Sequence, residues 1–436
     1  MMSTAVHAGV RAAGWVRALL LAVAMSLLLV IATAAPAAAG VDPVLEWNDV
    51  ARQLVVVPAL TPVEQTRLMA IVHVAMHDAV SAITHEYERY ARGASAPTGA
   101  TPEAAAISAA FTALKQLFPA PEAQALLASR YSTSLQNNGI APSDPGIAFG
   151  EAVAAGILAL RQNDGAALAR YVFIPPGAGS IGVWAPISTA PAAQSLLPGW
   201  GAVTPFVLRS GAQFRPDAPP AVGSRQFARD QDEVRAIGAQ STLDRTDEQT
   251  QIALFWRASP TALWNPVLRQ AVEARALSLS DTARVTALFY LAASDASVAC
   301  WEAKYYYNFW RPQAAIVAGD VDGNPGTVGD PAWLPLVPTP PHPEYPSGHA
   351  ANSGAMAAVL KLLFGDSPGF VIVATSSQNP GFIRRWDTFS EGVDEVIDAR
   401  VFSGIHFRTA DRVGASVGRQ VARFVMTHAL RPAKKR

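Results

Sequence analysis

The sequence predicts an all-α protein, a multi-helix bundle with long Pro/Gly-rich connections. Along most of the chain, apolar residues recur at the three- and four-residue steps of a helix face, whereas the alternation typical of strands is scarce. Hydrophobic residues make up 50% of the 436 residues and charged residues only 16%. A chain of this length and composition can bury a large core, so we expect two or three folded domains and no extensive disorder.

The first 39 residues have the composition of an export signal. Arg11 and Arg17 precede an apolar run from Ala18 to Ala35, and the three alanines at 37–39 then offer a cleavage site. We interpret residues 1–39 as a signal peptide, which would make the protein secreted or periplasmic. The alternative is a permanent membrane anchor, because the apolar run is about long enough to cross a bilayer.

The charges of the chain balance, with 34 basic and 34 acidic side chains. This balance gives no support for a nucleic-acid partner, and the sequence holds no P-loop, zinc-type cysteine pairing or dinucleotide fingerprint. Cys300 is the only cysteine, so the chain cannot form an internal disulfide. The apolar neighbours of Cys300 favour a small buried residue over a reactive thiol.

We divide the remaining chain into an N-terminal helical region, residues 40–222, and a C-terminal helical domain, residues 223–436. Residues 173–222 are rich in Pro, Gly and Ser with scattered aromatics. A connection of that length often covers or lines a site, and its tryptophans argue against a freely solvated linker. The helices predicted in the first region lie at 61–83, from a capped start at 101–103, at 124–135 and at 147–160.

One histidine pair has the spacing of a helical metal site. His73 and His77, with Asp78 beside them, lie four residues apart on the helix predicted at 61–83. No third ligand is evident in the neighbouring sequence, and the surrounding stripe is apolar. We therefore interpret the pair as structural.

Three segments of the C-terminal domain carry groups suited to an anion. In the first, Lys304 and Arg311 lie seven residues apart after an apolar helix predicted at 285–301. If that helix continues, the two cations face the same side, about two turns apart, until a proline ends it. Two cations on one stripe are costly to bury without an anion between them. The alternative is a solvated basic edge that pairs with Glu302 or Asp295.

The second segment places a serine, a glycine and a histidine at a helix start. Pro346 precedes Ser347, Gly348 and His349, and residues 350–364 are typical of a helix. Helix N-termini bind anions through unpaired N–H groups, and Gly348 would let an oxyanion approach the backbone. His349 would stand beside that anion with a pKa near neutrality, suited to proton transfer. The alternative is an ordinary helix cap followed by a surface histidine.

The third segment contains Arg400 and His406, at the end of a helix that starts near Ser390. At about 100° per residue, the two side chains would face different directions on one unbroken helix. Gly404 provides a break between them, so both can turn toward one centre. The alternative is a helix-terminal arginine and an unrelated core histidine.

Together, the three segments resemble the signature of the type 2 phosphatidic acid phosphatase (PAP2) and vanadium haloperoxidase superfamily. That signature has a lysine, six residues and Arg-Pro, then Pro-Ser-Gly-His, then an arginine, five residues and a histidine. This chain matches every block in order and internal spacing. The resemblance implies the family's helical fold for the C-terminal half, and the N-terminal helices look like those of bacterial vanadium-dependent haloperoxidase homologues.

The resemblance also implies a role for each motif residue. The residues that hold the oxygens of vanadate or phosphate would be Lys304, Arg311, Arg400, Ser347 and Gly348. His406 would bind the central atom axially, as a vanadium ligand or as a phosphoryl nucleophile, and His349 would be the acid–base group. His342 occupies a position where algal bromoperoxidases have histidine and a fungal chloroperoxidase has phenylalanine, and we count it with the catalytic residues.

Two residues depart from the family pattern. Ala399 replaces the serine usual before the arginine, and the carboxylate that often follows the axial histidine by four residues is displaced to Asp411. The group that orients His406 is therefore left open. A backbone carbonyl and another acid are the alternatives.

The resemblance implies one of two reactions in a single pocket. We favour a vanadate-dependent haloperoxidase, which uses hydrogen peroxide to oxidise halide to hypohalous acid for an organic acceptor. The alternative is an acid phosphatase that needs no cofactor and cleaves phosphate esters through a phosphohistidine. A membrane lipid phosphatase is disfavoured because the sequence holds no second long apolar span, and a non-catalytic protein because all three cations are retained. We also expect self-association as a homo-oligomer.

Overall fold

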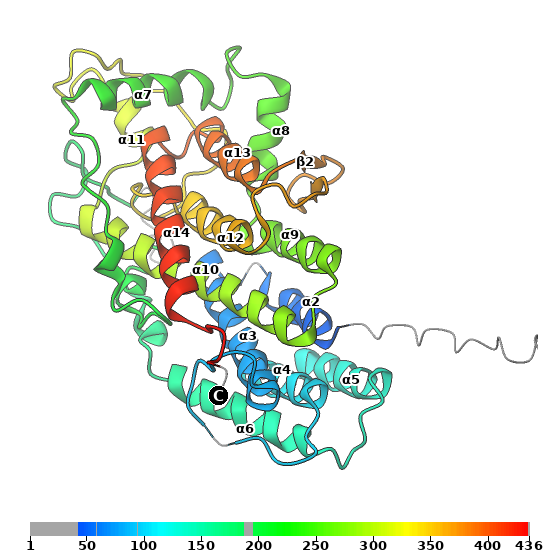
Figure 1. Cartoon of the computed structure of the whole chain (residues 1–436). Coiled ribbons are helices and arrows are strands. Elements are labelled where there is room, and N and C mark those ends of the chain that lie inside the picture. The colour runs from blue at the N-terminus through cyan, green and yellow to red at the C-terminus, as the bar shows by residue number, and fades with distance from the viewer. Residues whose placement is uncertain (1–41, 58, 94, 187–194, 435–436) are drawn as a thin grey trace, which may run out of the picture. The chain divides into compact units, whose positions relative to one another are not determined.

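The computed structural model describes residues 42–57, 59–93, 95–186 and 195–434 (Figure 1). Helices dominate these ranges, which confirms the predicted all-α class, and the one sheet within them is a pair of short antiparallel strands. No helix in the described part of the chain has both the length and the hydrophobicity that crossing a membrane requires. The predicted signal peptide, residues 1–39, lies outside the described residues.

The helices predicted in the N-terminal region are confirmed, each to within a few residues. They are α3 (Pro62–Thr84), α4 (Pro102–Leu117), α5 (Pro121–Asn137) and α6 (Pro145–Arg161), and the structure adds α2 (Pro43–Val55), which was not predicted. Each has a proline in its first turn, where the missing N–H group removes no helical hydrogen bond. Helix α3 starts with a capping box, in which Thr61 N–H donates to Glu64 Oε2 (2.9 Å) and Glu64 N–H donates to Thr61 Oγ1 (3.4 Å).

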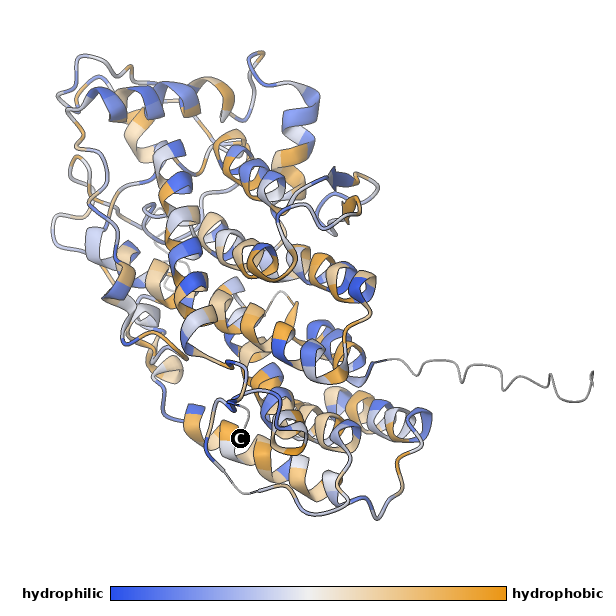
Figure 2. Cartoon of the chain, viewed as in Figure 1, coloured by the Kyte–Doolittle hydropathy of each residue, from blue (hydrophilic) through white to orange (hydrophobic). Residues whose placement is uncertain are grey.

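The C-terminal elements are α7 (Arg225–Ile237), α8 (Asp247–Phe255), α9 (Pro260–Arg275), α10 (Leu279–Tyr307), α11 (Pro312–Val317), α12 (Gly348–Phe364), β1 (Ile372–Ala374), β2 (Arg384–Trp386), α13 (Phe389–Phe402) and α14 (Arg408–His428). Helix α10 contacts α3 as well as α12 and α14. Helix α12 packs against α9, α10, α13 and α14, and hydrophobic residues predominate along it in Figure 2, whereas α7 is largely hydrophilic. The predicted division of the chain between 222 and 223 stays a prediction.

The Pro/Gly-rich segment predicted at 173–222 is packed onto the helices. Where it is described, its elements are the short 3-10 turns η3 (Trp200–Ala202) and η4 (Gly211–Phe214), and η1 (Ala166–Leu168) precedes it. Trp184 and Trp200 are buried. The carboxylate of Asp295 in α10 accepts the backbone N–H groups of residues 206–208 at 2.6 to 2.9 Å. A buried acid therefore anchors this segment to the core.

Helix α14 approaches α12 closely through two glycines. A Cβ atom at Gly414 would lie 2.4 Å from the carbonyl oxygen of Ser347, and one at Gly418 would lie 2.0 Å from that of Ala351. Both distances are far shorter than a van der Waals contact, so only glycine fits at these positions. This contact holds the start of α12, which carries Ser347 and Gly348, against α14.

We expect Gly418→Ala to lower the free energy of unfolding by about 2–3 kcal/mol, because the added methyl group forces α12 and α14 apart. Gly156→Ala in α6 is the matched control. A Cβ at Gly156 meets nothing within 4 Å, so alanine there should leave stability unchanged or raise it by up to about 1 kcal/mol. Urea unfolding of both variants measures the difference, and equal effects at the two positions would contradict the close packing.

Candidate oxyanion-binding site

The three predicted segments meet around one small cavity. Arg311 Nη1 lies 3.2 Å from Nε2 of His406, 95 residues away in sequence. Lys304 Nζ donates to the backbone carbonyl of Glu344 at 2.8 Å. The cavity has a volume of about 130 Å³, and the motif residues that line it are His342, Gly348, His349, Arg400 and His406. Groups that are distant in sequence therefore share one site.

Helix α10 ends earlier than predicted. It stops at Tyr307, where Asn308 adopts the left-handed conformation (φ 50°) that terminates a helix. Arg311 then stands at the N-cap of α11, so the expectation that one helix carries Lys304 and Arg311 to the proline was wrong. Both cations still contact the 342–344 segment, because the chain turns at Asn308 and presents Arg311 from a new element.

The alternative of a solvated basic edge is also wrong. Lys304 is 0% exposed and Arg311 is 2% exposed. The acids that sequence reasoning offered as their partners bind elsewhere. Glu302 pairs with Arg215 (Nε to Oε2, 2.9 Å), and Asp295 binds the backbone N–H groups of the covering segment.

Ser347 stands at the N-cap of α12, as predicted, but it does not cap the helix with its side chain. The Ser347 hydroxyl is buried and makes no hydrogen bond of ordinary geometry to the described residues, although it lies close enough to the Asp411 carboxyl to lower the pKa of that acid. Arg400 Nε is buried and unpartnered within those residues as well, whereas its Nη1 donates to the carbonyl of Trp256 (3.1 Å). Buried donors are rarely left unpaired, so both groups fit a shared oxyanion at the helix start.

Three buried cations and two buried acids define the electrostatics of the site. Burial lowers the pKa of Lys304 to about 7 and the pKa of both Arg311 and Arg400 to about 10. Burial raises the pKa of Glu344 to about 7 and the pKa of Asp411 well above its ordinary range. Burying charged side chains without water or a counter-ion lowers the stability of the fold. An anion bound between these cations would therefore stabilise their charged forms.

The histidines of the site have low pKa values. Burial disfavours the charged imidazole, and the surrounding cations lower the pKa further, so His342, His349 and His406 all have pKa values well below the ordinary 6.5. This corrects the expectation of a near-neutral pKa for His349, whose main charged neighbour is Arg400. The His349 Nε2–H donates to the carbonyl of Ala258 (3.2 Å), which leaves Nδ1 for proton exchange.

His406 reaches the cavity because the backbone breaks where predicted. Gly404 has a φ of 76°, two residues after α13 ends. A guanidinium can only donate, so Arg311 donates to Nε2 of His406 and the ring proton lies on Nδ1. That Nδ1 lies 2.9 Å from Oε1 of Glu344. Sequence reasoning missed Glu344, although its place inside the second motif segment was a usable signal.

The His73 and His77 pair lies in the core along α3. His73 accepts a hydrogen bond from Asn48 (3.0 Å), and Nε2 of His77 faces a backbone carbonyl 3.1 Å away. Within the described ranges, no group of three His, Cys, Asp or Glu side chains could hold a metal ion. Cys300 is buried, and burial raises the pKa of its thiol to about 11, as expected of a small core residue.

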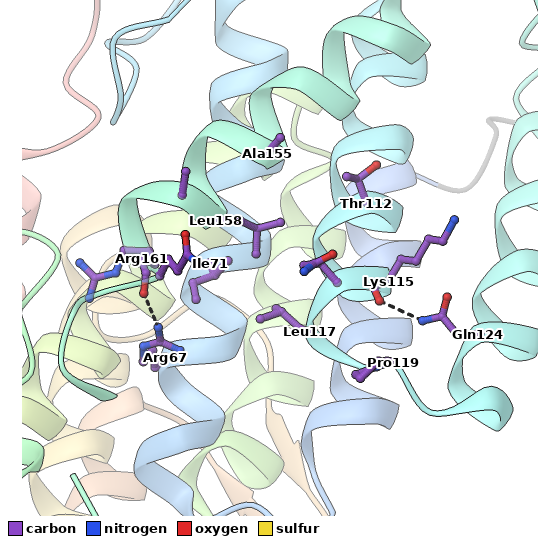
Figure 3. A pocket seen from close by; sticks show the side chains of 13 residues that line it. Arg67, Ile71, Thr112, Lys115, Leu117, Pro119, Gln124, Ala155, Leu158 and Arg161 are labelled. Carbon is purple, nitrogen blue, oxygen red and sulfur yellow. Dashed lines mark hydrogen bonds between the residues drawn. The ribbon is translucent and has the colours of Figure 1, made fainter. Parts of the chain in front are cut away.

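A larger hollow, of about 840 Å³, lies between α3, α4 and α6 (Figure 3). Arg67 and Arg161 line it, and both bind the carboxylate of Asp164, at 2.7 and 2.8 Å. Arg67 also donates to the backbone carbonyl of Arg161 (2.9 Å). Because both guanidinium groups already have a partner in Asp164, the smaller cavity with an unpartnered donor is the stronger candidate.

Comparison with known proteins gives likenesses in both sequence and structure. Residues 284–435 match the family model of the VCPO second helical-bundle domain. The vanadium chloroperoxidase of Curvularia inaequalis is 26% identical over 287 residues, which are 50% of this chain and 46% of that protein, so the chain spans about half the length of this relative. A bacterial vanadium-dependent iodoperoxidase superposes with a TM-score of 0.77 and 28% identity over 89% of this chain and 97% of that one.

A holo-type bacterial vanadium-dependent chloroperoxidase superposes with a TM-score of 0.62 over 85% of this chain and 94% of that one. At 18% identity, this last likeness is one of fold alone. The fold and the cavity define a class of protein, an all-α bundle that buries a cationic, histidine-containing site. Residues 284–435 carry the VCPO second helical-bundle domain, and the chain is similar in sequence and fold to vanadium haloperoxidases.

Proposed function

We propose that this chain is an exported, vanadate-dependent haloperoxidase-like enzyme that oxidises halide with hydrogen peroxide to hypohalous acid. The observation that carries the proposal is the buried, unpartnered Nε–H of Arg400 in the cavity that His406 also lines, with the Ser347 hydroxyl, which makes no hydrogen bond of ordinary geometry, beside Gly348 of the same cavity. An oxyanion would satisfy those donors and neutralise the cations around it. The relatives include an iodoperoxidase and a chloroperoxidase, which supports halide oxidation as the class of reaction.

Vanadate is the cofactor that these side chains fit. Its oxygens would be held by Lys304, Arg311, Arg400, the Ser347 hydroxyl and the Gly348 N–H, and Nε2 of His406 would ligate the vanadium. Bound vanadate supplies a Lewis acid that activates hydrogen peroxide toward halide without a change of its own oxidation state. The chain contributes the positive charge that holds the oxygens and the imidazole that completes the coordination.

His349 is the proposed acid–base group. With its Nε2–H on the carbonyl of Ala258, Nδ1 would accept a proton from hydrogen peroxide and later return a proton to the oxygen that leaves as water. His342 lies against Arg311, with Nδ1 2.9 Å from Nη2, and against the ring of Trp301, with 5.1 Å between the centroids. We propose that His342 acts in catalysis by setting how Arg311 faces the reactants.

An acid phosphatase is the second candidate. His406 would attack phosphorus while His349 protonates the leaving alcohol oxygen, and water would then cleave the phosphorus–nitrogen bond. The Glu344 carboxylate on Nδ1 of His406 suits such a nucleophile. However, a cavity of about 130 Å³ leaves little room for the alcohol part of a phosphate ester, and its walls are largely apolar, formed in part by Pro62, Val63 and Leu196. These features suit hydrogen peroxide and halide better.

The partners that we propose are small molecules. They are hydrogen peroxide, halide and an organic acceptor, which would react with hypohalous acid released from the small cavity, or a phosphate ester for the second candidate. We propose no nucleic-acid partner. Export, with no membrane anchor after signal removal, rests on the sequence of residues 1–39, and assembly into a homo-oligomer stays a prediction.

The proposal predicts that purified protein halogenates a phenolic dye when hydrogen peroxide, orthovanadate and iodide or bromide are present. Vanadate should raise the rate by at least about 100-fold over vanadium-free protein. The Arg400→Ala variant with the same vanadate is the control for the uncatalysed reaction. Hydrolysis of an aryl phosphate that vanadate inhibits, without any peroxide-dependent halogenation, would replace the proposal by the phosphatase.

A further inference from the structure

We propose that Glu344 is the positioning residue of His406, which accepts the Nδ1–H and fixes the direction of the imidazole. This inference rests on the proposed function and deepens it. Glu344 Oε1 accepts the Nδ1–H of His406 at 2.9 Å, and the two side chains are only 1% and 2% exposed. In the ligand-free site Arg311 donates to Nε2. The central atom of a bound oxyanion would take the place of this hydrogen bond at the Nε2 lone pair, while Glu344 holds the proton on Nδ1.

Glu344 holds the main chain as well as the ring. The N–H of Phe407 donates to the same Oε1 at 3.0 Å, so one oxygen binds both the ring of His406 and the following peptide group. Glu344 is itself anchored, since its N–H donates to the carbonyl of Phe309 (2.9 Å) and its carbonyl accepts from Lys304 Nζ (2.8 Å). The acid therefore links the lysine, the histidine and the loop before α12.

Asp411 is the acid that the family pattern suggests for this role, and its contacts argue against it. It is fully buried in the first turn of α14, and among the described residues neither of its oxygens has a hydrogen bond of ordinary geometry. The polar side chain that affects it most is the Ser347 hydroxyl, which lowers the pKa of Asp411 against the larger effect of burial. The Nδ1 proton of His406 is directed to Glu344 instead. Asp411 also interacts electrostatically with Arg400 and, like Glu344, has a pKa raised by burial. Asp411→Asn is therefore the matched control for the loss of one buried carboxyl group.

Charge and positioning predict different effects on oxyanion affinity. By charge alone, Glu344→Gln and Asp411→Asn should both strengthen the binding of vanadate and of phosphate, because each makes the pocket more positive. Vanadate would need the His406 nitrogen, whereas phosphate would bind through the cations. If Glu344 positions His406, variants of Glu344 should therefore lower the affinity for vanadate more than the affinity for phosphate. Glu344→Asp keeps the carboxyl group and shortens the side chain by one methylene. This variant therefore tests the contact with His406 without changing the charge of the side chain.

Calorimetric titration of the full protein with orthovanadate and with inorganic phosphate measures the ratio of the vanadate affinity to the phosphate affinity. We expect Glu344→Asp to weaken vanadate binding by about 10–100-fold with phosphate affinity unchanged, and Asp411→Asn to shift both affinities together. In a His406→Ala background, Glu344→Asp should have no further effect on vanadate. The inference is overturned if Asp411→Asn changes the ratio as much as Glu344→Asp does, or if Glu344→Asp acts equally with and without His406.

A second measurement needs no vanadate. Nitrogen NMR of the imidazoles, with His406 assigned from His406→Ala, should show the Nδ1–H form in the wild type and in Glu344→Asp, because Arg311 donates to Nε2 in both proteins. The Nδ1 resonance should shift in Glu344→Asp, because its hydrogen bond to the carboxylate is lost, and an unchanged Nδ1 resonance overturns the inference whatever the affinities are. If the Nδ1 resonance shifts as expected but the wild-type protein binds no vanadate, the proposed cofactor is overturned, while the positioning role stands.

Discussion

Replacing His406 by alanine should lower the rate of vanadate-dependent halide oxidation by at least about 1,000-fold. The ring is buried at 1% exposure, and its Nε2 is the nitrogen directed at the cationic cluster. Without that nitrogen, vanadate would be held by charge and hydrogen bonds alone, as phosphate is. Peroxide-dependent bromination at saturating vanadate, assayed side by side for both proteins, measures the loss.

Binding of inorganic phosphate separates this effect from a collapse of the pocket. Lys304, Arg311 and Arg400 remain in the His406→Ala variant, so phosphate should bind within about 10-fold of the wild-type affinity. His428→Ala changes an exposed histidine on α14 and is the matched control, which should retain the full rate. A His406→Ala protein that keeps more than about a tenth of the wild-type rate would contradict the axial role.

Replacing Lys304 by methionine should raise the stability of the ligand-free protein by about 1–4 kcal/mol and abolish oxyanion binding. Burial lowers the pKa of Lys304 from 10.5 to about 7. Between these pH values the unfolded chain binds more protons than the folded one, so the lysine destabilises the fold, and at pH 7 the cost is near its full value of roughly 4–5 kcal/mol. Methionine removes this cost but leaves the carbonyls of Pro343 and Glu344 without their donor, which offsets part of the gain.

Urea unfolding at pH 7, with and without orthovanadate, measures both effects of Lys304→Met. Vanadate should stabilise the wild type in proportion to its binding and leave the variant unchanged. Lys361→Met is the control, because Lys361 is half-exposed and pairs with Asp366 at the surface (2.7 Å), so a change within about 0.5 kcal/mol is expected. We interpret Lys304 as a residue that destabilises the fold and serves to bind the oxyanion. A Lys304→Met protein that is less stable than the wild type, or that vanadate still stabilises, would contradict this interpretation.

Local features of the fold were predictable because short-range geometry determines them. The start of α4 after Thr101 and the start of α12 after Ser347 depend on residues within one helical turn. The break at Gly404 follows from the angular spacing of Arg400 and His406 together with the conformational freedom of glycine. The helical class follows in the same way from the apolar periodicity, whereas the family was indicated by the resemblance of the three motif blocks to a known signature.

The features that sequence reasoning missed depend on contacts between distant segments or on burial. Glu344 acquires its role only when His406, 62 residues later, packs against its carboxylate. The low pKa of His349 depends on desolvation and on Arg400, and neither is visible in the local sequence. The end of α10 at Tyr307 requires a left-handed Asn308, which the apolar periodicity before it does not indicate.

The sequence by itself determined which reactive groups this protein has and how they are spaced within each block. Helix geometry is set by covalent structure and by hydrogen bonds a few residues apart, so a spacing fixes the relative direction of two side chains wherever the helix continues between them. Only the tertiary structure decided that Lys304, Arg311 and Arg400 are buried together, which donors stay unpartnered and which acid binds His406. Burial, pKa and the meeting of helices depend on side chains packed together from distant parts of the chain, and no local pattern encodes that packing.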